Sequence, residues 1–299
     1  MAGPRSYLRN RVEDAAVGLF LGILGRVGAE RADGLGRAVG RVARFALPGR
    51  RRLTEENISR AYPEKMPAEV KALAREVWSH FGGMLASLLR DARRPVSDLL
   101  TRVEFAGGEH LREAVSRGRG IFILTGHMGN WEIAALTMGA HGFPFLVVAR
   151  PLDNPLLDAR LRAFREATGN RVVAKNEAVR VMLRTLREKG MIGILPDQHV
   201  DPPDAVVVPF FGRPAATTTA VARLAARTGA LIVPTFCHRT GPDRWKVDFL
   251  PALDVSTLPE EERTVEAVTA RVSGILEEVI RRHPGQWLWL HNRWRVDGS

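Results

Sequence analysis

Cysteine is almost absent from this sequence: Cys237 is the single one among 299 residues. A single cysteine excludes a disulfide-stabilised scaffold and a metal site built from cysteines alone, and it fits a reducing compartment. With 45% hydrophobic and 26% charged residues, the composition is that of an ordinary globular protein. A disordered tail protein, a collagen and a multi-pass membrane protein are therefore excluded. The length predicts one or two domains with a sizeable core.

The motifs of several common enzyme classes are also missing. The chain has no Walker-type glycine-rich loop, no G-x-G-x-x-G after a strand, no G-x-S-x-G elbow and no H-E-x-x-H. Nucleotide-driven and serine-hydrolase chemistries are therefore disfavoured. His127, Asp197 and His199 suggest a metal site, but no second ligand pair has zinc-like spacing. We therefore expect neither a metal nor a cofactor.

Lysine is scarce as well. Only five of the 44 basic residues are lysines, and the others are arginines, the better bidentate partner for phosphate and carboxylate. Against 33 acidic residues this gives a net charge of +11, which suggests nucleic acid, an anionic membrane or an acidic substrate carrier as partner. Nucleic acid is disfavoured, because aromatic residues make up only 7% of the chain and no basic motif with interleaved stacking aromatics is present.

The positive charge is concentrated near the N-terminus, where residues 1–60 hold 12 arginines and six acidic residues. Within this region, the uncharged and mostly apolar segment Ala15–Gly25 is too short to span a bilayer, which takes about 20 residues. It also lacks the cleavage site of a secretory signal. Because basic residues flank it on both sides, the segment is predicted to lie in a membrane interface. A helix packed on the body of the protein is the alternative.

The chain divides into a helical, basic region, residues 1–95, and a second region, residues 96–299. In the first, Glu69–Arg90 carries apolar residues at helical spacing. In the second, short apolar runs alternate with amphipathic stretches, which predicts an α/β fold with a central, mostly parallel mixed sheet flanked by helices. We expect the two regions to pack as one unit. The predicted strands are Ile121–Thr125, Phe145–Ala149, Met191–Leu195, Val206–Val208, Leu231–Phe236 and Trp245–Leu250, and the predicted helices are Asn130–Ala140, Leu156–Thr168, Ala178–Lys189, Thr218–Thr228 and about Glu260–Arg282.

The segment Gly120–Glu132 (GIFILTGHMGNWE) carries the strongest chemical signal. An apolar strand runs into a turn that contains His127, and sites in open α/β sheets form at such carboxyl ends of strands. If His127 precedes the helix and Glu132 lies in its first turn, the carboxylate is placed to accept a hydrogen bond from Nδ1. Such a pair is able to remove a proton from a hydroxyl without a serine or cysteine nucleophile. The alternative is a histidine that caps the helix, with Glu132 favoured there by the helix dipole.

The segment GHMGNWE resembles the H-x-x-x-x-D/E motif of the glycerolipid acyltransferase superfamily. More narrowly, the chain resembles the bacterial lipid A biosynthesis acyltransferases of the late, lauroyl/myristoyl type, a set to which the phosphatidylinositol mannoside acyltransferases are related. Seven ordered blocks carry the resemblance: Glu55–Pro63, His127–Glu132, Ala149–Pro155, Ile194–His199, Val208–Thr217, Ala230–Pro234 and Gln286–Arg295.

The resemblance implies roles for individual residues. His127 is expected to be the general base and Glu132 to support it, while Arg150 is expected to hold an acceptor phosphate or sugar head group. Asp197, with Gln198, stands where the family places an acidic residue near the catalytic histidine. Asn130 is a further candidate for substrate binding. The superfamily's E-G-T-R block is not present as such, so Arg213 is a candidate for its phosphate-binding arginine, with a solvent-facing loop residue as the alternative.

The resemblance also implies a reaction, in which a fatty acyl chain moves from acyl carrier protein or coenzyme A to a hydroxyl of a lipid. The expected acceptor is a lipid A precursor or related glycolipid, and the expected location is the cytoplasmic face of the bacterial inner membrane. A lysophospholipid acyltransferase, and an esterase or phospholipase with the same dyad, remain as alternatives. The tryptophans of Gln286–Arg295 and the pair Phe210–Phe211 are compatible with lipid contact or with core packing.

Overall fold

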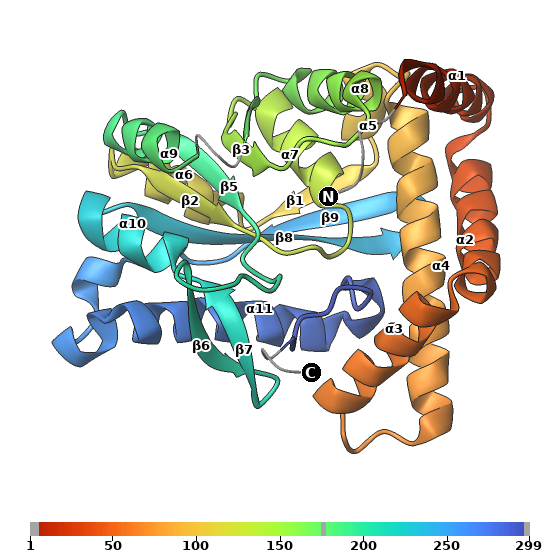
Figure 1. The fold of residues 1–299 in the computed structure, drawn as a ribbon. Helices are drawn as coiled ribbons and strands as arrows, with labels where there is room; N and C mark the ends of the chain where they lie inside the picture. Colours follow the sequence, from red (N-terminus) through yellow and green to blue (C-terminus); the bar gives the residue numbers. More distant parts are fainter. Residues whose placement is uncertain (1–5, 175–177, 296–299) are drawn as a thin grey trace.

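A seven-stranded sheet forms the centre of the computed structural model, which describes residues 6–174 and 178–295 (Figure 1). The strand order is β1-β9-β8-β2-β5-β3-β4, and every neighbouring pair is parallel except β8 and β9, which form an antiparallel hairpin. The predicted mixed, mostly parallel sheet is therefore confirmed. Its strands are β1 (Val103–Ala106), β2 (Ile121–Leu124), β3 (Leu146–Ala149), β4 (Arg171–Ala174), β5 (Met191–Ile194), β8 (Leu231–Gly241) and β9 (Arg244–Phe249).

Helices cover both faces of this sheet, and the alternation of side chains along β2 shows how. Phe122 and Leu124 point into a core shared with α9, α10 and α11, whereas Ile121 and Ile123 point into a second core shared with α6 and α7. All four residues are buried, which explains why the strand is a continuous apolar run. The helices of this region are α5 (Val96–Leu100), α6 (Gly108–Ser116), α7 (Trp131–Ala140), α8 (Pro155–Glu166), α9 (Ala178–Arg187), α10 (Ala220–Thr228) and α11 (Val265–Arg282).

Three strands were not predicted from the sequence, and one prediction needs correction. β1, β4 and β7 (Arg213–Thr218) contain polar or small residues and are only partly buried, so they lack the apolar run that marks a central strand. The predicted strand Val206–Val208 exists within β6 (Ala205–Phe210) but lies outside the central sheet, because it pairs with β7 in a separate antiparallel hairpin. Phe211 and Gly212, both with positive φ, make the turn.

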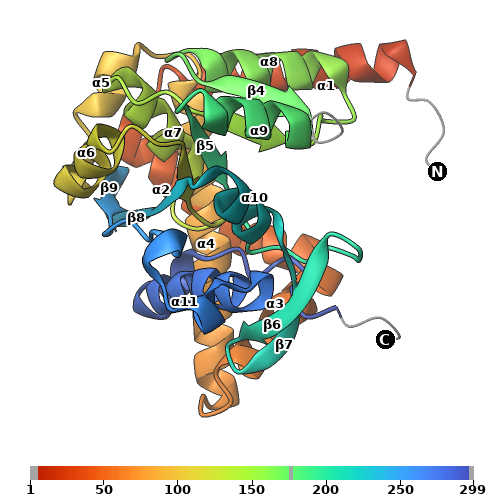
Figure 2. The same ribbon diagram turned by 90° about the vertical axis from the view of Figure 1, so that its left-hand side faces the viewer.

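Residues 6–91 form four helices beside the sheet: α1 (Tyr7–Leu24), α2 (Ala29–Ala46), α3 (Pro48–Ala61) and α4 (Pro67–Asp91). In Figures 1 and 2, α4 runs along one side of the sheet, with α2 and α3 packed against it and α1 beside α8. An ion pair between Arg160 on α8 and Asp14 on α1, 2.5 Å long, links the latter two helices at the surface. Most of the apolar residues at helical spacing within Glu69–Arg90 are buried, as the spacing predicts, but Leu85 is 52% exposed.

Buried polar contacts join the helical region to the rest of the molecule. The Nδ2 atom of Asn57 on α3 donates hydrogen bonds of 2.8 Å to the carbonyl oxygens of Trp289 and His291. Asp33 on α2 forms a buried 2.7 Å ion pair with Arg239 on β8, whose guanidinium also lies over the ring of Trp245. A buried polar or charged group that loses its partner costs free energy. These contacts therefore favour one position of α2 and α3 against the rest of the molecule.

Glycine residues allow α2 to lie very close to α4. A Cβ atom added at Gly40 would lie 2.1 Å from the carbonyl oxygen of Trp78, and one added at Gly36 would lie 2.4 Å from that of Gly82. At these positions only a hydrogen atom fits between the two backbones. Because the small face of α2 turns inward, its larger apolar side chains are left on the outside.

This packing predicts opposite effects for two glycine-to-alanine substitutions in α2. Gly40→Ala should force the helices apart and lower the free energy of unfolding by about 1–3 kcal/mol. Gly34→Ala, on the same helix, would place its Cβ where nothing lies within 4 Å. It should therefore stabilise the protein, by up to about 1 kcal/mol, through helix propensity. Urea unfolding of both variants tests the packing, and equal effects would contradict it.

Candidate active site

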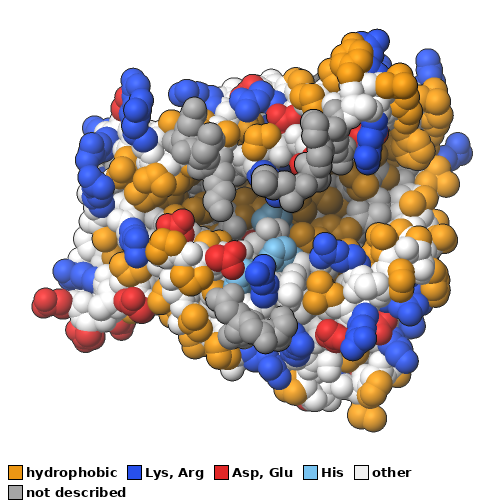
Figure 3. Space-filling model, in the orientation of Figure 1, with side chains coloured by type: hydrophobic (Ala, Val, Ile, Leu, Met, Phe, Trp, Pro, Cys, Tyr) orange, Lys and Arg blue, Asp and Glu red, His pale blue; other side chains and the backbone are white. Residues whose placement is uncertain are grey.

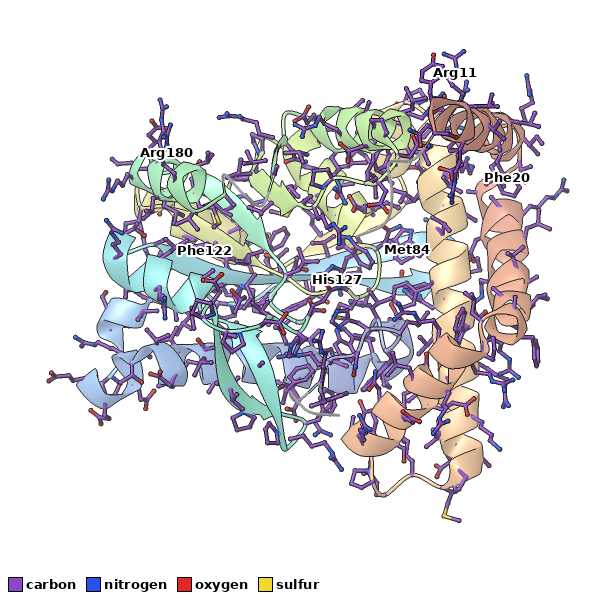
Figure 4. All side chains as sticks on the ribbon, viewed as in Figure 1. Arg11, Phe20, Met84, Phe122, His127 and Arg180 are labelled. Atoms are coloured by element: carbon purple, nitrogen blue, oxygen red, sulfur yellow. The ribbon has the colours of Figure 1, made fainter. Side chains whose placement is uncertain are left out.

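The loop between β2 and α7 presents His127 at the carboxyl end of the sheet (Figure 4). Asn130 is fully buried and begins α7, with its side-chain oxygen accepting a 3.1 Å hydrogen bond from the amide of Ile133. Gly129 has a φ of 57°, and a Cβ there would lie 1.8 Å from the carbonyl oxygen of Cys237. The loop therefore requires glycine at this position, where its backbone contacts that of β8 just before α7 begins.

Asp197 holds His127 through two contacts. Its Oδ1 lies 2.8 Å from Nδ1 of the imidazole, and its Oδ2 accepts a 2.7 Å hydrogen bond from the backbone amide of the same residue. Asp197 follows β5, which is the parallel neighbour of β2, so the two residues leave adjacent strands at the same edge. The indole Nε1 of Trp287 donates a third hydrogen bond, of 2.8 Å, to Oδ2.

This arrangement shifts the pKa values of His127 and Asp197 in opposite directions. Burial opposes protonation of His127, but the Asp197 carboxylate outweighs it and raises the pKa of the imidazole above its ordinary value. Burial likewise opposes ionisation of Asp197, yet the charge and hydrogen bonds of His127, with the Trp287 indole, lower its pKa to about 2. The carboxylate is thus ionised at physiological pH, and the imidazole titrates beside it. His127 keeps 23% of its side chain exposed, whereas Asp197 is buried.

Glu132 does not accept the hydrogen bond expected from Nδ1 of His127, because Asp197 occupies that place. Instead, the Glu132 carboxylate pairs with the guanidinium of Arg165 on α8, at 2.5 and 2.9 Å, and accepts a 3.2 Å hydrogen bond from Nε1 of Trp131. The reason is direction, since the first turn of α7 carries Glu132 toward α8 rather than back over the loop. The ring of Trp131 meets the edge of the His127 ring, with 5.1 Å between the centroids.

The other predicted site residues are spread more widely. Arg150, after β3, has 85% of its side chain exposed, 3.7 Å from Asp153. Gln198 follows Asp197 and is partly buried. Arg213 begins β7, and its Nε donates a 3.1 Å hydrogen bond to the carbonyl oxygen of Arg60 on α3. Of these candidates, the structure brings Asp197 into direct contact with His127.

Residues near the pair that sequence reasoning did not single out are Trp131, Arg165 and Gln286, and Trp287 was considered only for lipid contact or core packing. The C-terminal block Gln286–Arg295 was noted, but its tryptophans were left between lipid contact and core packing. They are core residues: Trp287, Trp289 and Trp294 are at most 6% exposed, and Phe210 and Phe211 pack against them. Nothing in the sequence marks Arg165, because its partner is set by the packing of α8 on α7.

Figure 3 shows histidine side chains at the centre of a hollow in this face of the molecule. Within residues 6–174 and 178–295, no group of three or more histidine, cysteine, aspartate or glutamate side chains is arranged to hold a metal ion. The chemistry that the arrangement supports is proton transfer at Nε2 of His127. Since Asp197 engages Nδ1 and the backbone amide, Nε2 is the ring nitrogen left for a substrate.

The family model of the bacterial lipid A biosynthesis acyltransferases matches residues 6–296. The chain belongs to this family. It is 28% identical over 265 residues to the lipid A biosynthesis lauroyltransferase of Escherichia coli K12, covering 88% of this chain and 84% of that protein. It is 27% identical over 262 residues to the phosphatidylinositol mannoside acyltransferase of Mycobacterium tuberculosis, covering 85% and 80% respectively. The family match confirms that this protein is an acyltransferase, as the resemblance carried by the seven sequence blocks implies.

Among solved structures, the 1-acyl-sn-glycerophosphate acyltransferase PlsC of Thermotoga maritima aligns with 93% of the chain and 99% of its own, at 12% sequence identity and a TM-score of 0.41.

The geometry predicts how His127 titrates when its partner changes. In Asp197→Asn, the carboxylate that raises the imidazole pKa is gone while burial remains, so the pKa should fall below that of the unmodified protein. NMR titration of the imidazole measures this directly. Asp201→Asn, which alters a neighbouring aspartate bound to His199, is the control and should leave the value unchanged. An unchanged pKa in Asp197→Asn would contradict the assigned pairing.

Proposed function

We propose that this acyltransferase moves a fatty acyl chain from an acyl thioester to a hydroxyl of a lipid acceptor, with His127 as general base. The observation that carries the proposal is the fixed pair of His127 and Asp197 at the carboxyl ends of β2 and β5. A histidine oriented by a buried carboxylate, with Nε2 facing the substrate, is the arrangement that general-base catalysis needs. No nucleophile on the protein is required, because the acceptor hydroxyl itself attacks.

The reaction balances with this single base. Nε2 takes the proton from the acceptor hydroxyl as its oxygen attacks the thioester carbonyl carbon. In this proposal, the oxyanion that forms is stabilised by backbone N–H groups near the start of α7. The carbon–sulfur bond then breaks, and the departing thiolate receives the proton from His127. Asp197 stays ionised throughout and stabilises the imidazolium between the two proton transfers.

Glu132 and Arg165 act beside this pair in the proposal. Their ion pair is largely buried, and the two charges act on His127 in opposite directions, since the Glu132 carboxylate raises the pKa of the imidazole and the Arg165 guanidinium lowers it. Glu132 therefore supports catalysis by holding Arg165 near the reacting groups rather than by binding Nδ1. Arg150, at the end of β3 on the same edge of the sheet, remains our candidate for an anionic head group, with Gln198, Asn130 and Arg213 as further substrate-binding candidates.

A glycolipid is the acceptor class that the relatives support, since the similar proteins named above act in lipid A biosynthesis or on phosphatidylinositol mannoside. The donor is an acyl thioester of acyl carrier protein or of coenzyme A. Both are anionic, and the net charge of +11 favours their approach. No further cofactor is needed for this reaction. A lysophospholipid acceptor, and attack by water, are the alternatives that the assay below distinguishes.

Exposed apolar side chains on the N-terminal helices α1 and α2 support a proposal that the protein binds to a membrane surface. No helix among the described residues is both long and apolar enough to cross a bilayer. The segment Ala15–Gly25 lies mostly in α1, where Leu21 and Leu24 are buried and three larger apolar side chains are exposed. A second exposed apolar set, which the sequence did not suggest, lies on the outer side of α2 (Figure 3). This outer α2 face consists of Leu35, Val39, Val42 and Phe45, each 57% to 68% exposed.

Arginines accompany both apolar sets, with Arg9 and Arg11 on α1 and Arg31, Arg41 and Arg44 on α2. Apolar side chains beside arginines fit an anionic bilayer surface, where the former enter the acyl region and the latter meet phosphate groups. We therefore propose peripheral attachment through α1 and α2 to the cytoplasmic face of the bacterial inner membrane.

Replacing the proposed base tests the reaction. His127→Ala should lower acyl transfer by about 10²–10⁴-fold while the protein remains folded, because only the proton acceptor is lost. His110→Ala, at a partly exposed histidine of α6, is the matched control and should retain activity.

The assay offers acyl carrier protein and coenzyme A thioesters with a lipid A precursor, a phosphatidylinositol mannoside and a lysophospholipid, and it follows both acyl transfer and fatty acid release. Fatty acid release without acyl transfer would show that the protein is a hydrolase and would overturn the proposed acyl transfer. A fully active, correctly folded His127→Ala protein would overturn the assigned base.

Charge introduced into the outer α2 face should weaken membrane binding. We expect the double variant Val39→Asp/Val42→Asp to bind phosphatidylglycerol-containing vesicles at least about tenfold more weakly, since two valine side chains can no longer enter the bilayer. Val207→Asp on β6, at a position that is 65% exposed, is the control and should bind normally. Vesicle co-sedimentation measures both. Unchanged binding of the double variant, or an equal loss in the control, would contradict attachment through α2.

A further inference from the structure

The segment Gln286–Leu288 runs directly beside the loop between β2 and α7 that carries His127. The amide of Gly129 donates a 2.9 Å hydrogen bond to the carbonyl oxygen of Gln286, and the amide of Leu288 donates one of 2.9 Å to the carbonyl oxygen of His127. Between them, Met128 and Trp287 form an antiparallel bridge. Two backbone bonds and a bridge thus fix Trp287 relative to His127, although about 160 residues separate them in the chain.

The side chain of Trp287 is as constrained as its backbone. It is 1% exposed and meets the rings of Trp289 and Phe210, with centroids 4.6 and 5.6 Å away. This packing leaves the indole one orientation, in which Nε1 donates its 2.8 Å hydrogen bond to Oδ2 of Asp197.

We propose that Trp287 is a positioning residue of the reaction, whose indole N–H locks the Asp197 carboxylate in the plane that orients His127. The inference rests on the proposed function, because it assigns Trp287 a part in the same proton transfer. Trp287 does not touch the substrate in this view and acts through Asp197.

The two oxygens of the Asp197 carboxylate have different hydrogen-bond donors. Oδ1 faces Nδ1 of His127, while Oδ2 accepts from the His127 amide and from the indole. Without the indole, Oδ2 keeps one donor, and rotation of the carboxylate about its Cβ–Cγ bond is restrained only by its two contacts with His127. Its charge is also less dispersed, so it binds the imidazolium more strongly. Loss of the N–H should therefore raise the pKa of His127 and lower the fraction of correctly aligned base.

Other charged groups also face the pair, two on α7 and α8 and two on the C-terminal segment that carries Trp287. Glu132 on α7 and Arg165 on α8 act on His127, while His291 interacts electrostatically with both His127 and Asp197, and Arg293 interacts with Asp197. A shift in the titration of His127 on changing Trp287 is attributable to the lost N–H when a control substitution in the same segment leaves that titration unchanged.

The chain contains a matched control for this residue. Trp294 belongs to the same buried aromatic cluster, but its Nε1 donates to the backbone carbonyl oxygen of Phe210, at 3.1 Å. A phenylalanine at either position removes an indole from the same core, and only the change at Trp287 removes a donor from Asp197.

The test compares Trp287→Phe with Trp294→Phe at matched folding, checked by thermal unfolding. For Trp287→Phe we expect kcat to fall about tenfold, as for the loss of one charge-assisted hydrogen bond, with KM little changed. The acid limb of its pH–rate profile should move to higher pH, because His127 must be unprotonated to act. Trp294→Phe should keep the unmodified profile. Identical kcat and acid limbs in the two variants would overturn the inference.

Two further measurements keep the test decisive. If Trp287→Phe fails to fold, site-specific benzothienylalanine at position 287 keeps the ring volume and lacks the N–H, and position 294 again serves as control. NMR titration of His127 needs no substrate, so it remains informative even if no acyl transfer is found. A raised His127 pKa in the 287 variant alone supports the positioning role, and an unchanged value refutes it independently of the proposed function.

Discussion

A buried carboxylate is stable only when donors surround it, and the centre of this molecule is organised by that requirement at Asp197. Its donors come from the loop after β2 and from the C-terminal segment, while Asp197 itself follows β5. The parallel pairing of β2 with β5 brings the loop after β2 next to Asp197. The backbone hydrogen bonds of Gln286–Leu288 bring the C-terminal segment to the same place. Moving any of these elements would leave an ionised group in the core with too few partners. The position of His127 is therefore a consequence of the sheet's strand order as much as of its own loop.

The same principle fixes the N-terminal helices. Asp33 and Arg239 form a buried pair between α2 and β8, and glycines allow α2 to approach the backbone of α4. An ordinary surface helix turns its large apolar residues toward the core, whereas α2 turns its small residues inward and exposes the large ones. The inner face is fully used by α4, so the exposed apolar residues on the outer face do not contribute to the core.

The arginine excess also divides into two groups once the fold is known. Some guanidiniums serve inside, where Arg165 pairs with Glu132 and Arg102 joins Asp91 and Asp243 in a buried cluster. Others, such as those of α1 and α2, remain on the surface. Each of these internal arginines has a specific carboxylate partner. This division explains why composition alone left three classes of partner open.

The sequence by itself determined the local features: the buried central strands, the long helix α4, and the placement of His127 in a turn at the end of a strand. These follow from continuous apolar runs and helical spacing within short windows. Strands β1, β4 and β7 were not predicted, because their residues are only partly buried and carry no such pattern. The resemblance already placed Asp197 near His127, 70 residues away, but only the tertiary structure decided that its carboxylate binds Nδ1 of His127 and that Trp287, 90 residues beyond it, donates to the same carboxylate. The reason is that hydrogen-bond partners are chosen by strand order and helix direction. The carboxylate five positions along the chain from His127 faces Arg165, whereas the one on the neighbouring strand faces the imidazole.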